Sequence, residues 1–291
     1  MIAHDCELER HDGRKRLELS FQAALASEYK GATQKIRILT EHWVSSQVYC
    51  PNCGHVSITQ YKNNSPVADF FCSNCREDYE LKGYKRAFGT KVVDGAYRTM
   101  MERLSASNNP NLLLMEYDHI RLEVRSLSVI PKQFFIPDII EKRKPLSSGA
   151  RRAGWVGCNI RLSTIPNAGR IVLIKNGIVE SPKDVIAKWR QTLFLRHQKD
   201  LRSKGWLLSI MGCIDKIQNP TFLLHDLYGF EQDLIAIYPE NRHIRPKIRQ
   251  QLQVLRDMGY LIFLGNGTYQ LAAPTGQNAP MEQDTASTES M

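Results

Sequence analysis

The sequence has no long apolar run. No stretch approaches the roughly 20 consecutive apolar residues that a transmembrane helix needs, although 42% of its 291 residues are hydrophobic and 24% are charged, which is a globular composition. The first residues are charged and lack the apolar segment of a secretory signal. These absences exclude membrane-spanning proteins and predict a cytoplasmic protein with reduced cysteines and no membrane partner.

Acidic residues are too few to balance the basic ones. The chain has 39 Lys and Arg against 30 Asp and Glu, which gives a formal net charge of +9. An anionic polymer is therefore the first partner to consider, although a solvated basic surface without such a partner would carry the same charge.

The sequence also lacks an internal repeat of about 20 to 50 residues, which excludes a solenoid. Its length is typical of two domains. Residues 1–20 and 272–291 are polar and without apolar periodicity, so we predict that both ends are disordered. Between them we predict an α/β domain over 21–199 and a helical domain over 200–271. The apolar patterns predict a helix over 33–46 and strands over 111–117, 122–130 and 170–175.

Four of the cysteines form two C-x2-C pairs separated by 18 residues; they are Cys50, Cys53, Cys72 and Cys75. This spacing is typical of a zinc site with four thiolate ligands. Such a zinc is structural, because no ligand position is left for a water molecule. A redox pair or unrelated reduced cysteines are the alternatives. A zinc deaminase is excluded, because its H-x-E and P-C-x-x-C patterns are missing.

Acidic and basic residues are placed around the second cysteine pair. Asp69 stands in an apolar stretch, expected to be a strand, where a carboxylate costs free energy unless it binds a cation or a hydrogen-bond partner. Glu80 and Lys82 are two residues apart and share one face of a following strand. If the cysteine loop joins the two strands, Asp69 and Glu80 converge. Two carboxylates can hold Mg²⁺, while a lysine beside them orients water or, as the neutral amine, deprotonates it, and as the ammonium offsets developing charge. An ordinary surface Glu-x-Lys pair is the alternative.

The pattern Asp69-x10-Glu80-x-Lys82 resembles the PD-(D/E)xK nuclease motif, and the chain from about residue 21 to 271 resembles the DpnI-type restriction endonucleases. The proline lies three residues before Asp69 rather than next to it, and the N-terminal extension and C-terminal tail are additional. The blocks that carry the resemblance are QKIRILTE (34–41), YCPNCG (49–54), PVADF (66–70), DGAY (94–97), RRAGW (151–155) and IRQQLQ (248–253).

The resemblance implies a fold and an activity. The fold is an α/β (α+β) PD-(D/E)xK nuclease core with an inserted four-cysteine zinc site, followed by a C-terminal winged helix-turn-helix domain. The activity is Mg²⁺-dependent cleavage of double-stranded DNA at GATC, only where the adenine is N6-methylated. Asp69, Glu80 and Lys82 are then catalytic, and Asp69 and Glu80 hold the magnesium ion. We expect the chain to act as a monomer.

Residues that could read the methyl group follow a basic segment. A flat aromatic wall suits an apolar methyl group, and Trp155 follows Arg151 and Arg152, which could hold phosphates. The resemblance implies that Trp155 contacts the methyl group. From the residues alone, a tryptophan buried in the core is the alternative.

The last segment has the order of a winged helix. We predict helices over 206–217, 223–237 and 243–258 and a hairpin over 260–271 that turns at Asn266 and Gly267. The third helix has an apolar face and an opposite face with Arg249, Gln250 and Gln253. Arginine pairs with guanine and glutamine with adenine in the major groove, and both bases occur in GATC. An ordinary solvated face is the alternative.

Two other classes of function fit parts of the sequence. In a non-catalytic DNA-binding regulator with a zinc site and a winged helix, Asp69, Glu80 and Lys82 would be structural. An RNA nuclease is disfavoured, because no RNA-binding aromatic motif is present. Glu41, on the first predicted helix, is a candidate for a further acid that assists the metal.

Overall fold

The computed structural model describes residues 17–62, 68–106, 108–198 and 200–274. The sequence predicts disorder over residues 1–20 and 272–291. Residues 1–16 and 275–291 of these ends lie outside the described residues. Residues 17–20 are part of the fold, because Ser20 forms a β-bridge with Glu123 and the Glu18 carbonyl accepts a hydrogen bond from Trp43 Nε1 at 2.7 Å. In the part of the chain that the structure describes, no helix combines the length and the apolar character needed to cross a bilayer.

A seven-stranded sheet forms the centre of the described residues, in the order β1-β2-β3-β5-β6-β9-β10. Only the β3–β5 pair is parallel; the other neighbours are antiparallel. The strands predicted over 111–117, 122–130 and 170–175 are confirmed as β5, β6 and β9. The bounds are β1 Thr59–Gln60, β2 Phe70–Phe71, β3 Asp78–Tyr84, β5 Asn111–Asp118, β6 Glu123–Ile130, β9 Ile171–Lys175 and β10 Ile178–Val179.

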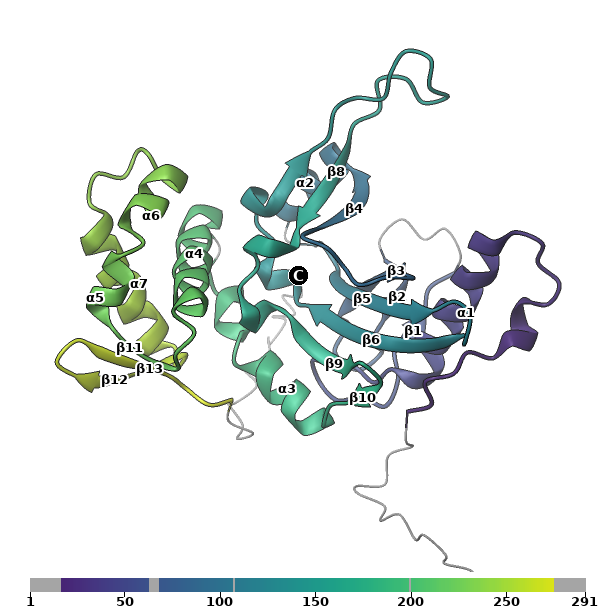
Figure 1. Ribbon diagram of the computed structural model, residues 1–291, viewed down its shortest axis with the longest axis horizontal. Coiled ribbons are helices and arrows are strands. Elements are labelled where there is room, and N and C mark those ends of the chain that lie inside the picture. The colour runs from purple at the N-terminus through teal and green to yellow at the C-terminus, as the bar shows by residue number, and fades with distance from the viewer. Residues whose placement is uncertain (1–16, 63–67, 107, 199, 275–291) are drawn as a thin grey trace, which may run out of the picture.

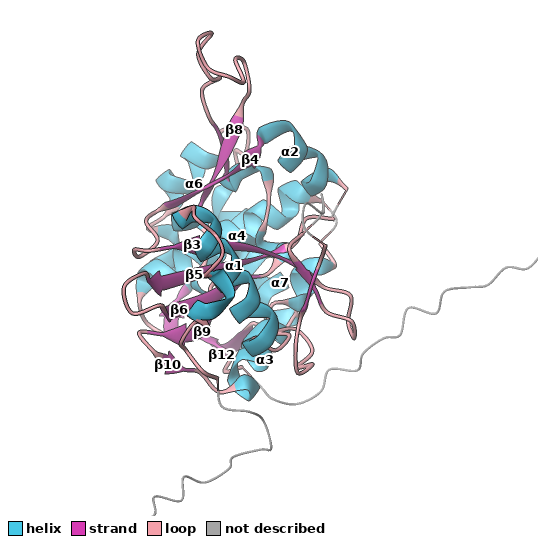
Figure 2. Cartoon of the chain, turned by 90° about the vertical axis from the view of Figure 1, so that its right-hand side faces the viewer, coloured by secondary structure: helices cyan, strands magenta, loops and turns pink. Residues whose placement is uncertain are grey.

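The parallel pair needs a crossover connection, and β4 (Lys91–Ala96) with α2 (Tyr97–Ser105) supplies it. β4 also pairs with β8 (Gly157–Arg161) in a small sheet whose order is β4-β8-β7, where β7 is Ile140–Lys142. The loop between β7 and β8 projects from the body of the molecule in both views (Figures 1 and 2). We call this small sheet the reader sheet and its loop (residues 143–156) the reader loop, after the methyl-reading role that the family resemblance implies for Trp155.

One face of the central sheet is covered by α1 (Ala32–Gln47) and α3 (Pro182–Arg190). The predicted helix over 33–46 is thus confirmed as α1. The buried side chains of this layer alternate along the strands, as the pleat of a sheet requires. They include Leu39 and Trp43 of α1, Leu113 and Met115 of β5, and Trp189 of α3.

The opposite face joins a second apolar cluster that continues into the C-terminal helices. Leu112, Leu114 and Ile130 of the sheet belong to the same cluster as Trp206 and Met211 of α4 (Leu201–Ile217). Short 3-10 helices lie along both layers: η1 Ala23–Ala26, η2 Lys132–Phe134, η3 Pro137–Ile139, η4 Leu162–Thr164, η5 Asn167–Gly169 and η6 Leu193–Arg196. The two predicted domains therefore share a continuous core, with α4 next to the part of the molecule that contains the central sheet (Figure 1).

The C-terminal unit has winged helix-turn-helix order. Its elements after α4 are β11 Thr221–Leu223, α5 Leu224–Tyr228, α6 Glu231–Ile237, α7 Ile244–Asp257, β12 Leu261–Gly265 and β13 Thr268–Leu271. The hairpin turn is confirmed, because Asn266 and Gly267 both have positive φ, 48° and 72°. α4 begins before the predicted residue 206, because the Asp200 side chain caps it by accepting a hydrogen bond from Ser203 N at 2.8 Å.

The single helix predicted over 223–237 is wrong. The chain forms strand β11 up to Leu223 and then two helices, with a break at Gly229 and Phe230. Glycine has a low helix propensity, and the amides of Gly229 and Phe230 bond to carbonyls three residues earlier, at Asp226 and Leu227. Such tightened bonds end a helix rather than extend it. The periodicity of the apolar residues continues across the break, which explains why the sequence predicts one helix.

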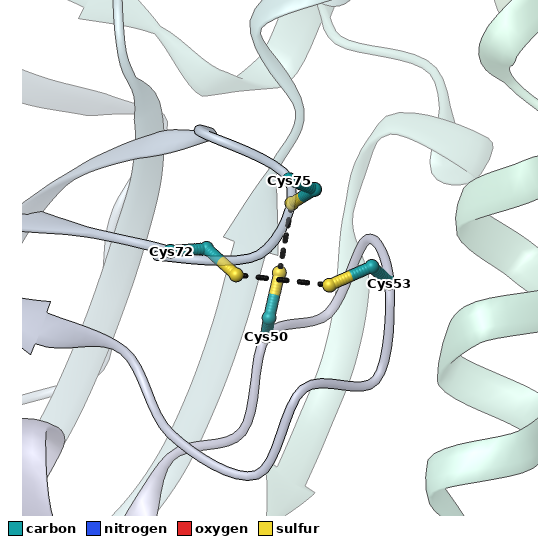
Figure 3. Close-up of side chains that lie close together, drawn as sticks. All are labelled: Cys50, Cys53, Cys72 and Cys75. Atoms are coloured by element: carbon teal, nitrogen blue, oxygen red, sulfur yellow. Dashed lines mark hydrogen bonds between the residues drawn. The ribbon is translucent and has the colours of Figure 1, made fainter. Parts of the chain in front are cut away.

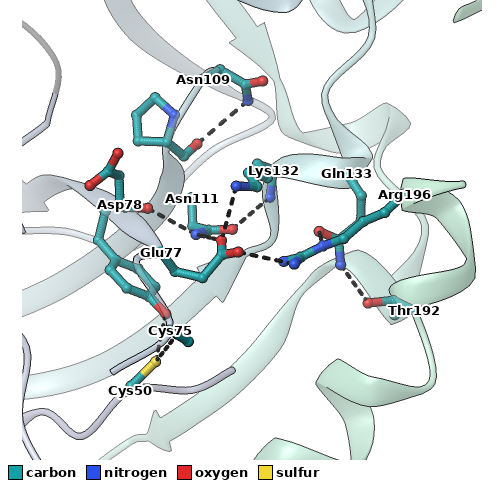
Figure 4. A network of polar contacts seen from close by, with 12 residues as sticks. Cys50, Cys75, Glu77, Asp78, Asn109, Asn111, Lys132, Gln133, Thr192 and Arg196 are labelled. Carbon is teal, nitrogen blue, oxygen red and sulfur yellow. Dashed lines mark hydrogen bonds and ion pairs between the residues drawn. The ribbon is translucent and has the colours of Figure 1, made fainter. Parts of the chain in front are cut away.

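A buried carboxylate ties the second cysteine pair to distant parts of the chain (Figure 4). The Glu77 side chain is 7% exposed and lies 3.0 Å from Arg196 of η6 and 3.3 Å from Lys132 of η2. It also accepts a hydrogen bond from Asn111 Nδ2 at 2.8 Å. Because η6 leads into α4, this network connects the cysteine loop to the C-terminal unit.

Glu77→Ala is expected to lower the free energy of unfolding by about 2 kcal/mol, less than the cost of breaking a fully buried pair, because Lys132 and Arg196 remain partly hydrated. Urea unfolding of the full chain measures this. The control is Glu102→Ala, which removes an exposed pair with Arg98 on α2 and should cost less than about 0.5 kcal/mol. Equal losses in the two variants would show that the network does not stabilise the fold.

Candidate active site and metal centre

The four cysteines converge from two separate turns (Figure 3). Cys50 and Cys53 follow α1, and Cys72 and Cys75 form the turn between β2 and β3. The four sulfurs all lie within 4.8 Å of one another, with 3.5 Å between Cys50 and Cys75 and 3.7 Å between Cys53 and Cys72. Four thiolates around one zinc ion at about 2.3 Å would be about 3.8 Å apart. The cluster therefore fits a zinc ion.

The surroundings of the cluster favour a structural metal. Cys50 and Cys72 are fully buried, and the Cys50 sulfur lies 3.1 Å from the Tyr79 hydroxyl. The hydrogen bond between the two thiols lowers the pKa of Cys75 to about 5 and raises that of Cys50. The pair therefore shares one proton, which binding of a zinc ion would release. Since the protein supplies four ligands, no tetrahedral position remains for a reacting water.

The cysteine turn also fixes Asp69 beside β3. Asp69 lies in a bend immediately before β2, not within a strand as the sequence predicts. Its amide donates to the Tyr79 carbonyl at 3.0 Å, which continues the β2–β3 pairing by one step. Beyond that step its side chain replaces the strand partner, because Asp69 Oδ2 accepts a hydrogen bond from Leu81 N at 2.7 Å. The carboxylate thus accepts the hydrogen bond of a β3 amide that has no strand partner at this position, and this bond holds the carboxylate beside β3.

Glu80 and Lys82 lie on one face of β3, as the sequence predicts. Lys82 Nζ is 2.6 Å from Glu80 Oε1. Together with Asp69, both side chains line a hollow of about 320 Å³ at the edge of β3. The structure therefore brings the three residues of the predicted triplet into one site.

Glu41, the further acid suggested by the sequence, lines the same hollow from α1. Its side chain is 12% exposed; one oxygen accepts a hydrogen bond from Arg37 Nε at 2.6 Å and the other from Gln60 Nε2 at 2.9 Å. Carboxylate oxygens are the ligands that Mg²⁺ prefers. The donor set of Asp69, Glu80 and Glu41 therefore suits a magnesium ion in its chemistry. In the described residues, however, the oxygens of these three carboxylates do not all lie within 4.8 Å of one another, so an ion bound by all three would have to draw them closer.

Asp94 is a residue of this site that the sequence analysis did not select. Its carboxylate lies 2.8 Å from Lys82 Nζ and is 7% exposed. The sequence gives no clear signal for it, because Val92 and Val93 are both apolar. Only the structure shows that the buried one is Val92, which shares a strand face with Asp94.

The charges of the site influence one another. Burial raises the pKa of Glu80, and the negative charges of Asp94 and Asp69 raise it further, while Lys82 opposes them. Burial alone would lower the pKa of Lys82, but the neighbouring carboxylates of Glu80 and Asp94 outweigh it, so that its pKa is raised. Both carboxylates thus stabilise the ammonium form of Lys82, which can orient water or offset negative charge.

Trp155 lies at the base of the reader loop and is half-buried. It belongs to neither apolar core cluster, so the alternative of a buried core tryptophan is wrong. The guanidinium of Arg152 lies over its ring at 4.9 Å from the centroid, and Arg151 is exposed. The indole packs on Gly157, where an added Cβ would come within 2.8 Å of the ring. A glycine is therefore needed at position 157 for this placement.

The exposed face of α7 carries the predicted polar residues. Arg249, Gln250 and Gln253 are exposed, whereas Ile248 and Leu252 on the other side are fully buried. Arg249 Nη1 donates to the Tyr228 hydroxyl of α5 at 2.9 Å. The face is thus available to a partner while one of its arginines is already oriented.

Cys72→Ser is expected to reduce the zinc content from about one ion per chain to near zero and to lower the melting temperature, because metal binding contributes to folding. Elemental analysis and thermal denaturation measure both. The control is Cys213→Ser, which changes a buried cysteine of α4 outside the cluster and should keep the zinc. A wild-type protein purified without added metal that contains no zinc would contradict the assignment.

Comparison with known protein families agrees with this geometry. Residues 17–198 match the family described as DpnI, the Dam-replacing family, and residues 202–271 match DpnI_C, the Dam-replacing HTH domain. The mixed α/β core, the four-cysteine cluster and the C-terminal helix-turn-helix domain confirm the fold class predicted from the sequence. The helix-turn-helix domain supports DNA binding, and the family supports a nuclease. The chain belongs to the DpnI, or Dam-replacing, family.

Proposed function

We propose that this protein is a methyl-directed restriction endonuclease that acts as a monomer. It hydrolyses phosphodiester bonds of double-stranded DNA at GATC sites whose adenine is N6-methylated, and it requires Mg²⁺. The observation that carries the proposal is the convergence of Asp69, Glu80 and Lys82 on one hollow at the edge of β3. Membership of the family supports the reaction class, and the helix-turn-helix domain supports the substrate.

Asp69 and Glu80 would hold the magnesium ion, with Glu41 as a further ligand from α1. A bound magnesium ion polarises a phosphoryl oxygen and neutralises charge on the phosphate. The Leu81 amide fixes Asp69 through its hydrogen bond, so the carboxylate needs little reorganisation. Lys82 places an ammonium beside these acids, where it orients water and offsets the negative charge that develops during hydrolysis.

Two parts of the chain would recognise the DNA. Arg151 and Arg152 of the reader loop contact phosphates, and Trp155 offers an apolar wall to the N6-methyl group. On α7, Arg249 pairs with guanine and Gln250 and Gln253 with adenine in the major groove. Because one methyl group contributes only about 1 kcal/mol on burial, two linked readers discriminate better than one.

A buried cluster of charges supports an enzyme over a non-catalytic regulator. Glu80 and Lys82 are each about a quarter exposed or less, and Asp94 is nearly buried. Burying charged groups costs free energy, and such clusters occur preferentially at catalytic sites. The Glu77 network is a buried charge cluster with a structural role, but Glu80 and Lys82 differ from it because they line a hollow that a ligand can enter.

Lys82→Ala is expected to reduce cleavage of an adenine-methylated plasmid by at least about 1000-fold, because it removes charge stabilisation at the reacting phosphate. Binding to the same DNA should stay within about twofold, since groove reading lies on other elements. The assay compares methylated and unmethylated plasmid with Mg²⁺. The control is Lys91→Ala, which removes a lysine paired with Glu141 on the reader sheet. Cleavage of both plasmids by the wild type, or parental activity of Lys82→Ala, would contradict the proposal.

Trp155→Ala is expected to lower the preference for methylated over unmethylated GATC by about fivefold, which corresponds to the loss of one buried methyl contact. Competition binding of the full chain in Ca²⁺, which allows binding without cleavage, measures the ratio. The control is Trp155→Phe, which keeps an aromatic wall and should retain most of the preference. An unchanged ratio in Trp155→Ala would mean that other residues sense the methyl group.

A further inference from the structure

Asp94 joins the site from a different sheet. It lies on β4, in the reader sheet, whereas Asp69, Glu80 and Lys82 belong to the β2–β3 hairpin of the central sheet. Its Oδ1 is 2.8 Å from Lys82 Nζ, and its side chain is 7% exposed. The Lys82 ammonium thus forms two ion pairs, one with Glu80 at 2.6 Å and one with Asp94.

The two partners of Lys82 differ in what else they would do. Glu80 would bind the magnesium ion, and a carboxylate that binds a cation attracts a neighbouring ammonium less strongly. In the proposed site, Asp94 does not bind the magnesium ion. It is therefore the partner that can keep Lys82 in place when the metal is bound.

The strand that carries Asp94 is paired with the base of the reader loop. Asp94 is opposite Cys158 and Ala96 is opposite Gly157, with an irregularity in the register between the two pairs. Gly157 is the residue on which the Trp155 indole packs. Asp94 is therefore opposite the residue next to Gly157, on which the indole of the predicted methyl reader packs.

We propose that Asp94 is a positioning residue, which holds the Lys82 ammonium for cleavage and anchors it to the sheet that bears the reader loop. The proposal rests on the proposed function, because it concerns a residue that acts through Lys82. Asp94 acts on the rate of bond cleavage and not on DNA affinity. A direct role as a metal ligand is the competing assignment, and the experiment separates the two.

The test measures single-turnover cleavage of methylated GATC duplex with full-length protein in excess, together with DNA affinity and the Mg²⁺ concentration at half-maximal rate. Asp94→Asn keeps the shape but removes the charge. It is expected to slow cleavage about 10- to 100-fold at saturating Mg²⁺, while the DNA affinity and the Mg²⁺ midpoint change by less than about threefold. Glu141→Gln is the control, because it also removes a carboxylate paired with a lysine on the reader sheet, and it should cut at the parental rate.

Asp94→Glu provides the second variant. It is larger than aspartate but keeps the anion, so it is expected to cut more slowly than the wild type and faster than Asp94→Asn. If packing alone mattered, the order would be reversed, because asparagine is nearly identical in volume to aspartate. Zinc content and melting temperature establish that each variant is folded. If Asp94→Asn does not fold, a folded Asp94→Glu decides. A cleavage rate between those of the wild type and Lys82→Ala supports the proposal, whereas a parental rate, or a rate as low as that of Lys82→Ala, overturns it.

The remaining outcomes are distinct. A wild-type protein that leaves methylated DNA intact shows that the proposed function is wrong. A wild-type protein that cuts, with Asp94→Asn equally fast, overturns the role of Asp94 alone. Recovery of the parental rate in Asp94→Asn at high Mg²⁺ concentration also overturns it, because a lost metal ligand rather than a displaced lysine would then explain the defect.

Discussion

Closure of the turn between β2 and β3 by four thiolates determines where the acidic residues of the site lie. β2 contains only two residues, and a strand this short does not define a stable pairing by itself. A zinc ion shared with the turn after α1 would contribute about 10 to 16 kcal/mol to folding of such a segment. With the turn closed, the pairing continues to Asp69, and its carboxylate reaches the Leu81 amide.

The hairpin that this turn closes also contributes to two groups of poorly exposed charges. Glu77, directly after the cysteine turn, binds Arg196 and Lys132, whereas Glu80 and Asp94 bind Lys82. The first group joins the cysteine loop to the C-terminal unit, and the second joins the hairpin to the reader sheet. Both place charged side chains in poorly hydrated surroundings, where groups that are already oriented interact more strongly than in water.

Local patterns in the sequence predict most of this arrangement. The cysteine spacing, the Asp69, Glu80 and Lys82 triplet and the Asn266–Gly267 turn depend on neighbours within a short stretch of chain. Asp94 was missed because its contact with Lys82 is made across two sheets, which no local pattern encodes. The break at Gly229 was missed because the apolar periodicity continues through it. Tertiary contacts decide both features.

The most direct measurement is calorimetric titration of Ca²⁺ or Mn²⁺ into the zinc-loaded protein and into the double variant Asp69→Asn, Glu80→Gln. We expect the wild type to bind a divalent ion in addition to its zinc, and the double variant to lose this affinity by at least about tenfold while its zinc content is unchanged. Equal affinity in both proteins would contradict the claim that the zinc-closed hairpin brings Asp69 and Glu80 together to hold a catalytic metal.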